Sequence, residues 1–219
     1  MLSFAEENYL KAIYHLSNSG TLEVSTNALA EAMATKPASV SDMIKKLSTK
    51  GVVRYQPYRG VNISSEGKIQ ALQIIRKHRL WEVFLVEKLK FNWDQVHEVA
   101  EQLEHIKSSL LIAKLDKFLG FPRVDPHGDP IPDEEGNIKL VSKTPLCDWE
   151  INCPSKVVAV DNSDPKFLKH LDKLGIYLGA EINILEKLEF DSSLEVHLDG
   201  KKKLFLSKAA ARNILVLNK

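Results

Sequence analysis

The sequence predicts an α+β protein of several domains, with helices in its first half and short strands towards its end. Three observations support this prediction. Apolar residues recur at helical spacing over most of residues 3 to 119, two β-rich runs interrupt them near residues 52 to 64, and several short strand patterns follow residue 152. A chain of 219 residues has room for one or two domains of average size, or for three small ones.

The first sixty residues predict three helices followed by a hairpin. The first helix spans residues 3 to 17 and precedes Gly20. Ser25 or Thr26 can cap the second helix, VSTNALAEAM, and Pro37 suits the first turn of the third, ATKPASVSDMIKKLSTKG. Two β-rich runs around a turn with proline and glycine, VVRYQPYRGVNIS, favour a hairpin. Helix, helix, short turn, helix and hairpin is the order of a winged helix-turn-helix.

The middle and the tail of the chain differ in pattern. From Glu66 to about Leu119 the pattern is helical, and its apolar density favours a helix–helix dimer contact, although packing within one chain is equally allowed. A proline-rich, acidic segment then predicts an extended connector, FPRVDPHGDPIPDEEGNIKLVSKTPLCDW. From Asn152 a short helix, DPKFLKHLDKLG, accompanies four strand candidates, which suggests a small β-barrel: KVVAV, AEINILEKLEF, SLEVHL and KKLFLS.

Composition narrows the class of protein. Hydrophobic residues make up 44% and charged residues 27%, and no apolar run approaches the roughly 20 residues that cross a bilayer. The start, MLSFAEENYLKAIY, lacks a basic leader with a long apolar segment, so we expect a cytoplasmic protein. Cys147 and Cys153 fit no zinc or redox spacing, and we expect both to be reduced thiols.

The net charge of +1 conceals an uneven distribution. The stretch from Lys36 to Arg59 contains six basic residues and one acidic residue, whereas the stretch from Phe121 to Pro165 contains four basic and nine acidic residues. A concentrated basic stretch in a nearly neutral chain favours a surface that binds a polyanion. The alternative is a helical hairpin with a solvated basic face.

The basic stretch coincides with the predicted helix-turn-helix, so DNA is the expected polyanion. Residues near the start of the third helix would contact the DNA there: Ser39, Ser41, Asp42 and Lys45. Four further basic residues would reach phosphates: Lys46, Lys50, Arg54 and Arg59. The full candidate set is Thr26, Lys36, Pro37, Ala38, Ser39, Ser41, Asp42, Lys45, Lys46 and Arg59.

A second pattern suggests a metal site. In VHEVAEQLEHI, four residues able to bind a metal fall on one helical face: His97, Glu101, Glu104 and His105. The preceding helix adds His78 and Glu82 in KHRLWE. Two helices that each offer imidazoles and carboxylates could surround Mn²⁺, Fe²⁺, Co²⁺ or Zn²⁺. Taken alone, each His and Glu pair is more often a solvated helical pair than a ligand set.

Catalysis is the weaker interpretation of these residues. The metal-rich stretches lack the Glu-x-x-His pairs of di-iron bundles and the His-Glu-x-x-His signature of zinc proteases. A helical metalloenzyme therefore remains an alternative of another class, and a DNA-binding protein with a permanent structural metal remains a second alternative.

The order of these motifs resembles the diphtheria-toxin-repressor family of metal-dependent transcriptional regulators. A winged helix-turn-helix is followed by RKHRLWE, VHEVAEQLEH, DPHGDPIP and a small β-rich tail, so the resemblance covers nearly the whole chain. It implies a DNA-binding domain at residues 1–64, a helical metal-binding and dimerisation domain with connector at 65–142, and an SH3-like domain at 150–219 that resembles ferrous-transport accessory domains.

The resemblance also implies a function. A homodimer activated by Mn²⁺ or Fe²⁺, with Zn²⁺ or Co²⁺ as substitutes in vitro, would bind a double-stranded operator and repress genes for metal uptake. No membrane partner, small-molecule substrate or catalytic activity is expected.

Carried over by position, the resemblance implies two metal sites. The primary site would use Asn8, His78, Glu101, Glu104 and His105. The ancillary site would use Glu82, His97, Asp125, His127 and an acid of the tail, Asp161 or Asp164. Glu101 stands where manganese-responsive members tend to have glutamate and iron-responsive members cysteine.

Two residues depart from the family pattern. Asn8 replaces the usual acid or methionine, and Lys11 stands where manganese regulators often have a second glutamate. Because an ammonium disfavours a second cation beside the first, we expect one metal ion at the primary site rather than a close pair.

Overall fold

The computed structural model describes residues 2–56, 59–139 and 141–218 as two compact units. The first unit comprises residues 1–78, 101–113 and 131–138, and the second comprises residues 79–100, 114–130 and 139–219. Three helices contribute residues to both units: α4 (Ser65–Glu87), α5 (Val96–Leu103) and α6 (Ser109–Phe118). No helix of the described residues is long and apolar enough to cross a membrane.

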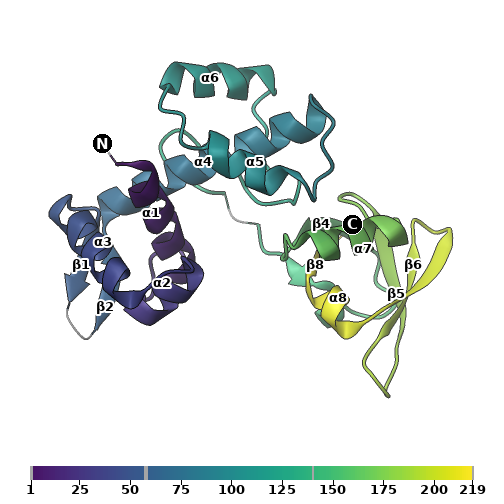
Figure 1. Cartoon of the computed structure of the whole chain (residues 1–219). Coiled ribbons are helices and arrows are strands. Elements are labelled where there is room, and N and C mark those ends of the chain that lie inside the picture. The colour runs from purple at the N-terminus through teal and green to yellow at the C-terminus, as the bar shows by residue number, and fades with distance from the viewer. Residues whose placement is uncertain (1, 57–58, 140, 219) are drawn as a thin grey trace. The chain divides into compact units, whose positions relative to one another are not determined.

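The first unit begins with the predicted winged helix-turn-helix (Figure 1). Its elements are α1 (Phe4–Leu16), α2 (Thr26–Ala32), α3 (Pro37–Thr49), β1 (Val53–Gln56) and β2 (Gly60–Ile63). Ser3 caps α1 in a capping box with Glu6, and Ser25, one of the two predicted candidates, caps α2. Pro37 occupies the first turn of α3 as expected. The predicted turn residues 57 and 58 lie outside the described residues.

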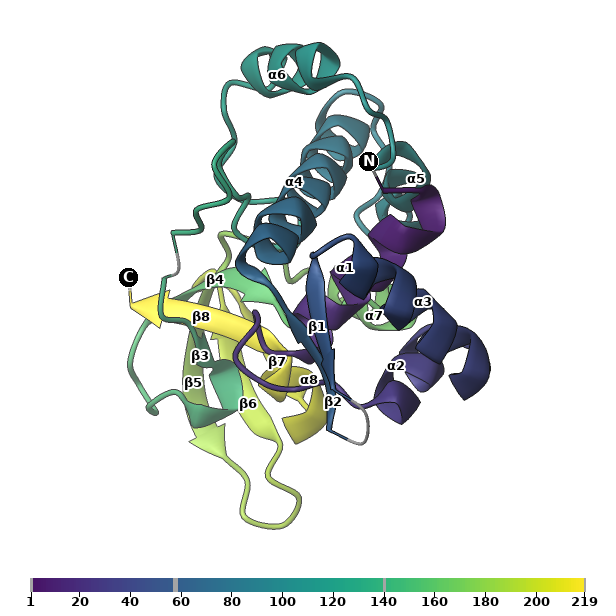
Figure 2. The same cartoon turned by 90° about the vertical axis from the view of Figure 1, so that its left-hand side faces the viewer.

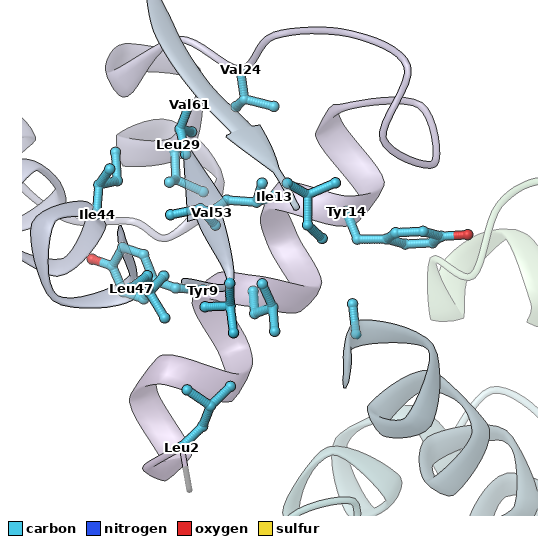
Figure 3. Close-up of a cluster of buried hydrophobic side chains, with 14 of the residues drawn as sticks. Leu2, Tyr9, Ile13, Tyr14, Val24, Leu29, Ile44, Leu47, Val53 and Val61 are labelled. Carbon is cyan, nitrogen blue, oxygen red and sulfur yellow. The ribbon is translucent and has the colours of Figure 1, made fainter. Parts of the chain in front are cut away.

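Fully buried side chains hold the three helices against the hairpin (Figure 3). Ile13 of α1, Leu29 of α2, Ile44 and Leu47 of α3, and Val61 of β2 have no exposed surface. The hairpin is antiparallel, and Val24 extends it through two backbone hydrogen bonds of 2.9 Å with Val61. The third helix is therefore packed directly with the first, because one apolar core serves both.

The helix α5 is shorter than its periodicity predicts. It ends at Leu103, and Glu104 and His105 lie in the turn that follows. The expectation that His97, Glu101, Glu104 and His105 share one helical face is therefore wrong for the last two residues. Periodicity within one helix contains no information about the bonds that Glu104 makes to other elements, which are described below.

The second unit contains the β-rich tail (Figure 2). Its antiparallel sheet has the strand order β3-β8-β4-β5-β6-β7. The strands are β3 (Thr144–Pro145), β4 (Ser155–Val160), β5 (Glu181–Lys187), β6 (Leu194–Leu198), β7 (Lys202–Leu206) and β8 (Ile214–Asn218). Helices α7 (Pro165–Leu174), α8 (Lys208–Arg212) and η1 (Leu146–Asp148) accompany them.

The predicted strands and the helix of the tail are confirmed, with two differences. Two elements, the strand β8 and the short helix α8, were not predicted, although β8 pairs with both β3 and β4. The described sheet is also not closed into a barrel, since β3 and β7 are its edges and β3 is only two residues long. Between Phe118 and Thr144 the described residues form no helix or strand, apart from a bridge between Val124 and Pro130, as expected for a connector. The end of the predicted connector, up to Trp149, instead forms β3 and η1.

Candidate metal centres

A buried group of polar side chains, here called the inner cluster, lies within the first unit. It consists of Glu7 and Lys11 on α1, His78 on α4, and Glu104 and His105 in the turn after α5. The side chain of Glu104 is 0% exposed and lies at the centre of the bonds between these groups. Lys11 Nζ donates to Glu104 Oε1 at 2.7 Å and to Oε2 at 2.9 Å, and His78 Nδ1 lies 2.6 Å from Oε2.

These bonds keep Glu104 in the form that binds a cation. Burial alone would raise the pKa of Glu104, but the hydrogen bond with His78 and the charge and hydrogen bond of Lys11 outweigh burial and lower that pKa. The carboxylate is therefore ionised at neutral pH, as a metal ligand must be.

The geometry around His105 leaves one ring nitrogen available. Nδ1 lies 2.6 Å from Glu7 Oε2, and the ring of Phe4 lies 3.7 Å away between centroids. Because an ionised carboxylate only accepts hydrogen bonds, Nδ1 donates to Glu7, and in the neutral ring the lone pair would then be on Nε2. Nε2 is buried without a hydrogen-bond partner among the described residues, 3.7 Å from Glu104 Oε1. A histidine that donates one ring N–H to a carboxylate and directs its other ring nitrogen towards a metal is typical of metal sites.

The structure brings together three of the five residues predicted for the primary site. His78, Glu104 and His105 belong to the inner cluster, whereas the side chain of Glu101 is 50% exposed and lies 3.5 Å from Lys11 Nζ. Asn8 is half-buried, and its side chain makes no hydrogen bond with a described residue. Glu7 was missed; its position one helical turn before Lys11 could have indicated that both side chains share a face.

A second group, the outer cluster, lies within the second unit. It consists of Glu82 on α4, His97 on α5, and Asp125 and His127 in the connector. Ligand atoms of Glu82, Asp125 and His127 all lie within 4.8 Å of one another, and all three residues are buried. His97 Nδ1 lies 3.6 Å from Glu82 Oε1, with its side chain 49% exposed. Two carboxylates and two imidazoles fit a divalent transition-metal ion.

The charges of the outer cluster are crowded. Burial, Glu82 and Asp129 raise the pKa of Asp125 to about 6, against the opposing effect of Arg79. Burial disfavours the charged form of His127, but Glu82 and Asp125 outweigh it and raise the pKa of this imidazole. In the absence of a metal ion, protons on Asp125 and His127 thus reduce the buried negative charge of the outer cluster. A bound metal ion would neutralise that charge instead.

Backbone contacts hold the outer cluster against the tail. His127 O accepts a hydrogen bond of 2.9 Å from Val160 N at the end of β4. Gly128 has a φ of +86°, and a Cβ there would lie 2.1 Å from Val158 O, so only glycine fits. His127 Nε2 lies 2.9 Å from Trp93 O, which leaves Nδ1, 3.8 Å from Glu82 Oε2, for a metal.

The two predicted tail ligands lie outside this compact group. Asp161 follows β4 and is exposed, and Asp164 caps α7 through a bond from Lys166 N to Oδ1. Among the described residues, neither joins a group of ligand atoms within 4.8 Å.

The candidate DNA-contacting residues are accessible in the first unit. Thr26 and Ser41 are half-buried, and the other candidates are exposed, mostly on α3 and the residue before it. Ser41 Oγ donates to Pro37 O, and Lys45 Nζ lies 3.4 Å from Asp42 Oδ1. Arg59 directly precedes β2 of the hairpin, and its backbone N–H donates to Gln56 O at 3.2 Å.

A winged helix-turn-helix together with two clusters of carboxylates and imidazoles is the architecture of a DNA-binding protein with candidate metal sites. Residues 1–61 match the N-terminal DNA binding domain of the iron dependent repressors, and residues 64–133 match their metal binding and dimerisation domain. Residues 144–218 match the FeoA domain. The chain belongs to the iron-dependent repressor family, which includes the diphtheria toxin repressor.

Several relatives of known name or structure resemble the chain. The iron-dependent repressor IdeR of Mycobacterium leprae is 32% identical over 150 residues, which are 64% of this chain and 65% of that protein. The diphtheria toxin repressor of Corynebacterium glutamicum is 26% identical over 83% of each chain. A manganese-dependent transcriptional repressor solved with manganese is 34% identical, with a TM-score of 0.85 over 98% of this chain and 100% of that one.

Proposed function

We propose that the chain is a cytoplasmic, homodimeric repressor that binds operator DNA when loaded with Mn²⁺ or Fe²⁺ and controls genes for uptake of that metal. One observation carries this proposal: α1 belongs to the apolar core of the DNA-binding domain and also supplies Glu7 and Lys11 to the inner cluster. Occupancy of the cluster can therefore bias the position of the domain that contacts DNA.

The coupling follows from linkage between two binding events. If the arrangement that holds the metal ligands together is also the arrangement that fits DNA, each binding event favours the other by the same factor. Two recognition helices of a dimer must meet major grooves about 34 Å apart. Lys50, at the end of α3, donates to Glu6 Oε2 at 2.7 Å, so α1 contacts the recognition helix on one side and the inner cluster on the other.

Bound at either cluster, a divalent ion would supply positive charge among buried carboxylates. At the inner cluster Glu104 and His105 Nε2 would hold it with His78, and the neighbouring, half-exposed Glu101 would be a further ligand. In the outer cluster Glu82, His97, Asp125 and His127 would hold it, with Asp161 or Asp164 as a further candidate. These carboxylates and imidazoles, without a thiolate, favour Mn²⁺ or Fe²⁺. Zn²⁺ binds such ligands tightly as well, so activation rather than affinity must discriminate.

The roles on the DNA side follow from exposure and charge. Ser39, Ser41 and Asp42 are the candidates for base contacts, and Lys45, Lys46 and Arg59 are the candidates for phosphate contacts. Lys36 and the first turn of α3 would approach the backbone of the duplex.

The test is DNA binding as a function of metal. Duplexes selected from a random pool in the presence of Mn²⁺ are titrated with protein in Mn²⁺, Fe²⁺, Zn²⁺ or chelator, at one salt concentration because phosphate contacts are salt-dependent. We expect Mn²⁺ or Fe²⁺ to tighten binding. Equal affinity in metal and in chelator would instead indicate a permanent structural metal.

A further inference from the structure

The ammonium of Lys11 lies against the buried carboxylate of Glu104, where it supplies a positive charge. It contacts both oxygens of Glu104 at 2.7 and 2.9 Å, its side chain is only 15% exposed, and Glu104 is fully buried. A buried carboxylate is costly without a partner of opposite charge, and Lys11 provides that charge in the metal-free chain.

We propose that Lys11 is a built-in competitor of the metal ion for Glu104 and thereby sets the metal concentration at which the inner cluster loads. This inference rests on the proposed binding of metal at that cluster. A divalent ion held by Glu104 and His105 Nε2 would lie beside the ammonium, since that nitrogen is 3.7 Å from the same carboxylate. Like charges at such separations repel strongly in a buried site, so the ammonium must withdraw.

The competition has a thermodynamic signature. The bond between Lys11 and Glu104 stabilises the metal-free fold, and loading must give up that stabilisation. Removal of the ammonium should therefore destabilise the metal-free protein and strengthen metal binding together. A lysine with a purely structural role would stabilise both states equally, and its removal would not tighten metal binding.

A neighbouring lysine offers a matched control. Lys77 on α4 is half-buried and interacts with the charges of Glu7 and Glu104. Its side chain makes no hydrogen bond with Glu104 among the described residues. Lys77→Met thus removes a nearby positive charge without removing a partner of the carboxylate.

The experiment uses the full chain carrying Asp125→Asn, which removes an outer-cluster ligand so that the inner cluster is observed alone. In this background, Lys11→Met, Lys11→Gln and Lys77→Met are each compared with the chain that has no further substitution. Calorimetric titration with Mn²⁺ and thermal unfolding, in chelator and in saturating Mn²⁺, are measured without DNA. We expect both Lys11 variants to bind Mn²⁺ at least about tenfold more tightly, or ~1.4 kcal/mol. They should also melt at a lower temperature in chelator, while Lys77→Met has a clearly smaller effect on both quantities.

Several outcomes overturn the inference. The first is unchanged or weaker Mn²⁺ binding in both Lys11 variants. The second is a loss of melting temperature in these variants that is equal with and without metal. The third is an effect of Lys77→Met on Mn²⁺ affinity and melting temperature that is as large as that of the Lys11 variants. Lys11→Gln keeps a donor for Glu104 and replaces the methionine variant if that one does not fold. If Mn²⁺ controls DNA binding but the Lys11 variants bind Mn²⁺ normally, only this inference fails; if they bind Mn²⁺ more tightly but DNA binding ignores metal, only the proposed function fails.

Discussion

Within the inner cluster, Glu7 holds Nδ1 of His105, so that the other ring nitrogen, Nε2, lies on the side of Glu104. The carboxylate of Glu7 accepts the bond from Nδ1 at 2.6 Å, and Phe4 packs on the same ring. The family resemblance directed attention to the next position, Asn8, because it implied a ligand there. Sequence patterns identify which residues share a helix face, but they do not show which of two adjacent polar side chains reaches a partner nearly a hundred residues away.

Replacement of Glu7 should therefore affect metal binding through His105. We expect Glu7→Gln to weaken Mn²⁺ binding at the inner cluster by about 10- to 100-fold, because an amide orients the imidazole and raises its basicity less well than a carboxylate. Calorimetric titration measures this, and Glu7→Asp should recover part of the loss. The control is Glu6→Gln, since Glu6 bonds to Lys50 instead. Equal losses in both variants would contradict the assigned role.

Asp125 should make the stability of the metal-free protein depend on pH. Its pKa rises from the ordinary 3.8 to about 6 mainly through burial, so the folded chain keeps a proton that the unfolded chain has lost. Between about pH 4 and 6 the free energy of unfolding contributed by this group falls as pH rises. Between about pH 4 and 6, urea unfolding in chelator should show a slope of unfolding free energy against pH that is more positive for Asp125→Asn than for the unmodified chain. An unchanged slope in that variant would count against the prediction.

At the scale of elements, the sequence predicted those helices and turns whose ends are determined by residues close to them in the chain. The capping serine of α2, Pro37 of α3 and the hairpin after it were all visible in the sequence. The end of α5 at Leu103 and the strand β8 were not. Both depend on distant partners: Glu104 bonds to α1 and α4, and β8 is completed by pairing with β4, so periodicity alone could not place them.

The helix α3 and the wing should contribute differently to DNA recognition. We expect Arg59→Ala to weaken binding to all duplexes and to lower the salt dependence, because a phosphate contact carries no sequence information. Ser39→Ala should instead change sequence preference, with a cost of about 1 to 3 kcal/mol on the preferred duplex if a base contact is lost. Binding to selected and random duplexes at several salt concentrations separates the two. A uniform loss in both variants would refute the assigned roles.

At the scale of the molecule, the outer cluster depends on packing between the connector and the sheet of the second unit. We expect Gly128→Ala to abolish metal binding at the outer cluster while the inner cluster still binds, because the added Cβ collides with Val158 O. Gly120→Ala is the control, since Gly120 also has a positive φ, +79°, but nothing lies within 4 Å of its Cβ. Metal stoichiometry measured by equilibrium dialysis should fall only in the first variant. Equal stoichiometry in both would show that the close approach at Gly128 is unimportant.

Each compact unit contains one of the two candidate metal clusters, and this has a consequence for how the protein would respond to the metal concentration. If both clusters bind metal as proposed, their different ligands, and the bond between Lys11 and Glu104 in the inner cluster, would make them half-filled at different metal concentrations. We therefore expect a dose–response curve with two steps, spread over a wider range of concentration than a single receptor could cover. A cell that carries this protein would then distinguish scarcity, sufficiency and excess, rather than only presence from absence.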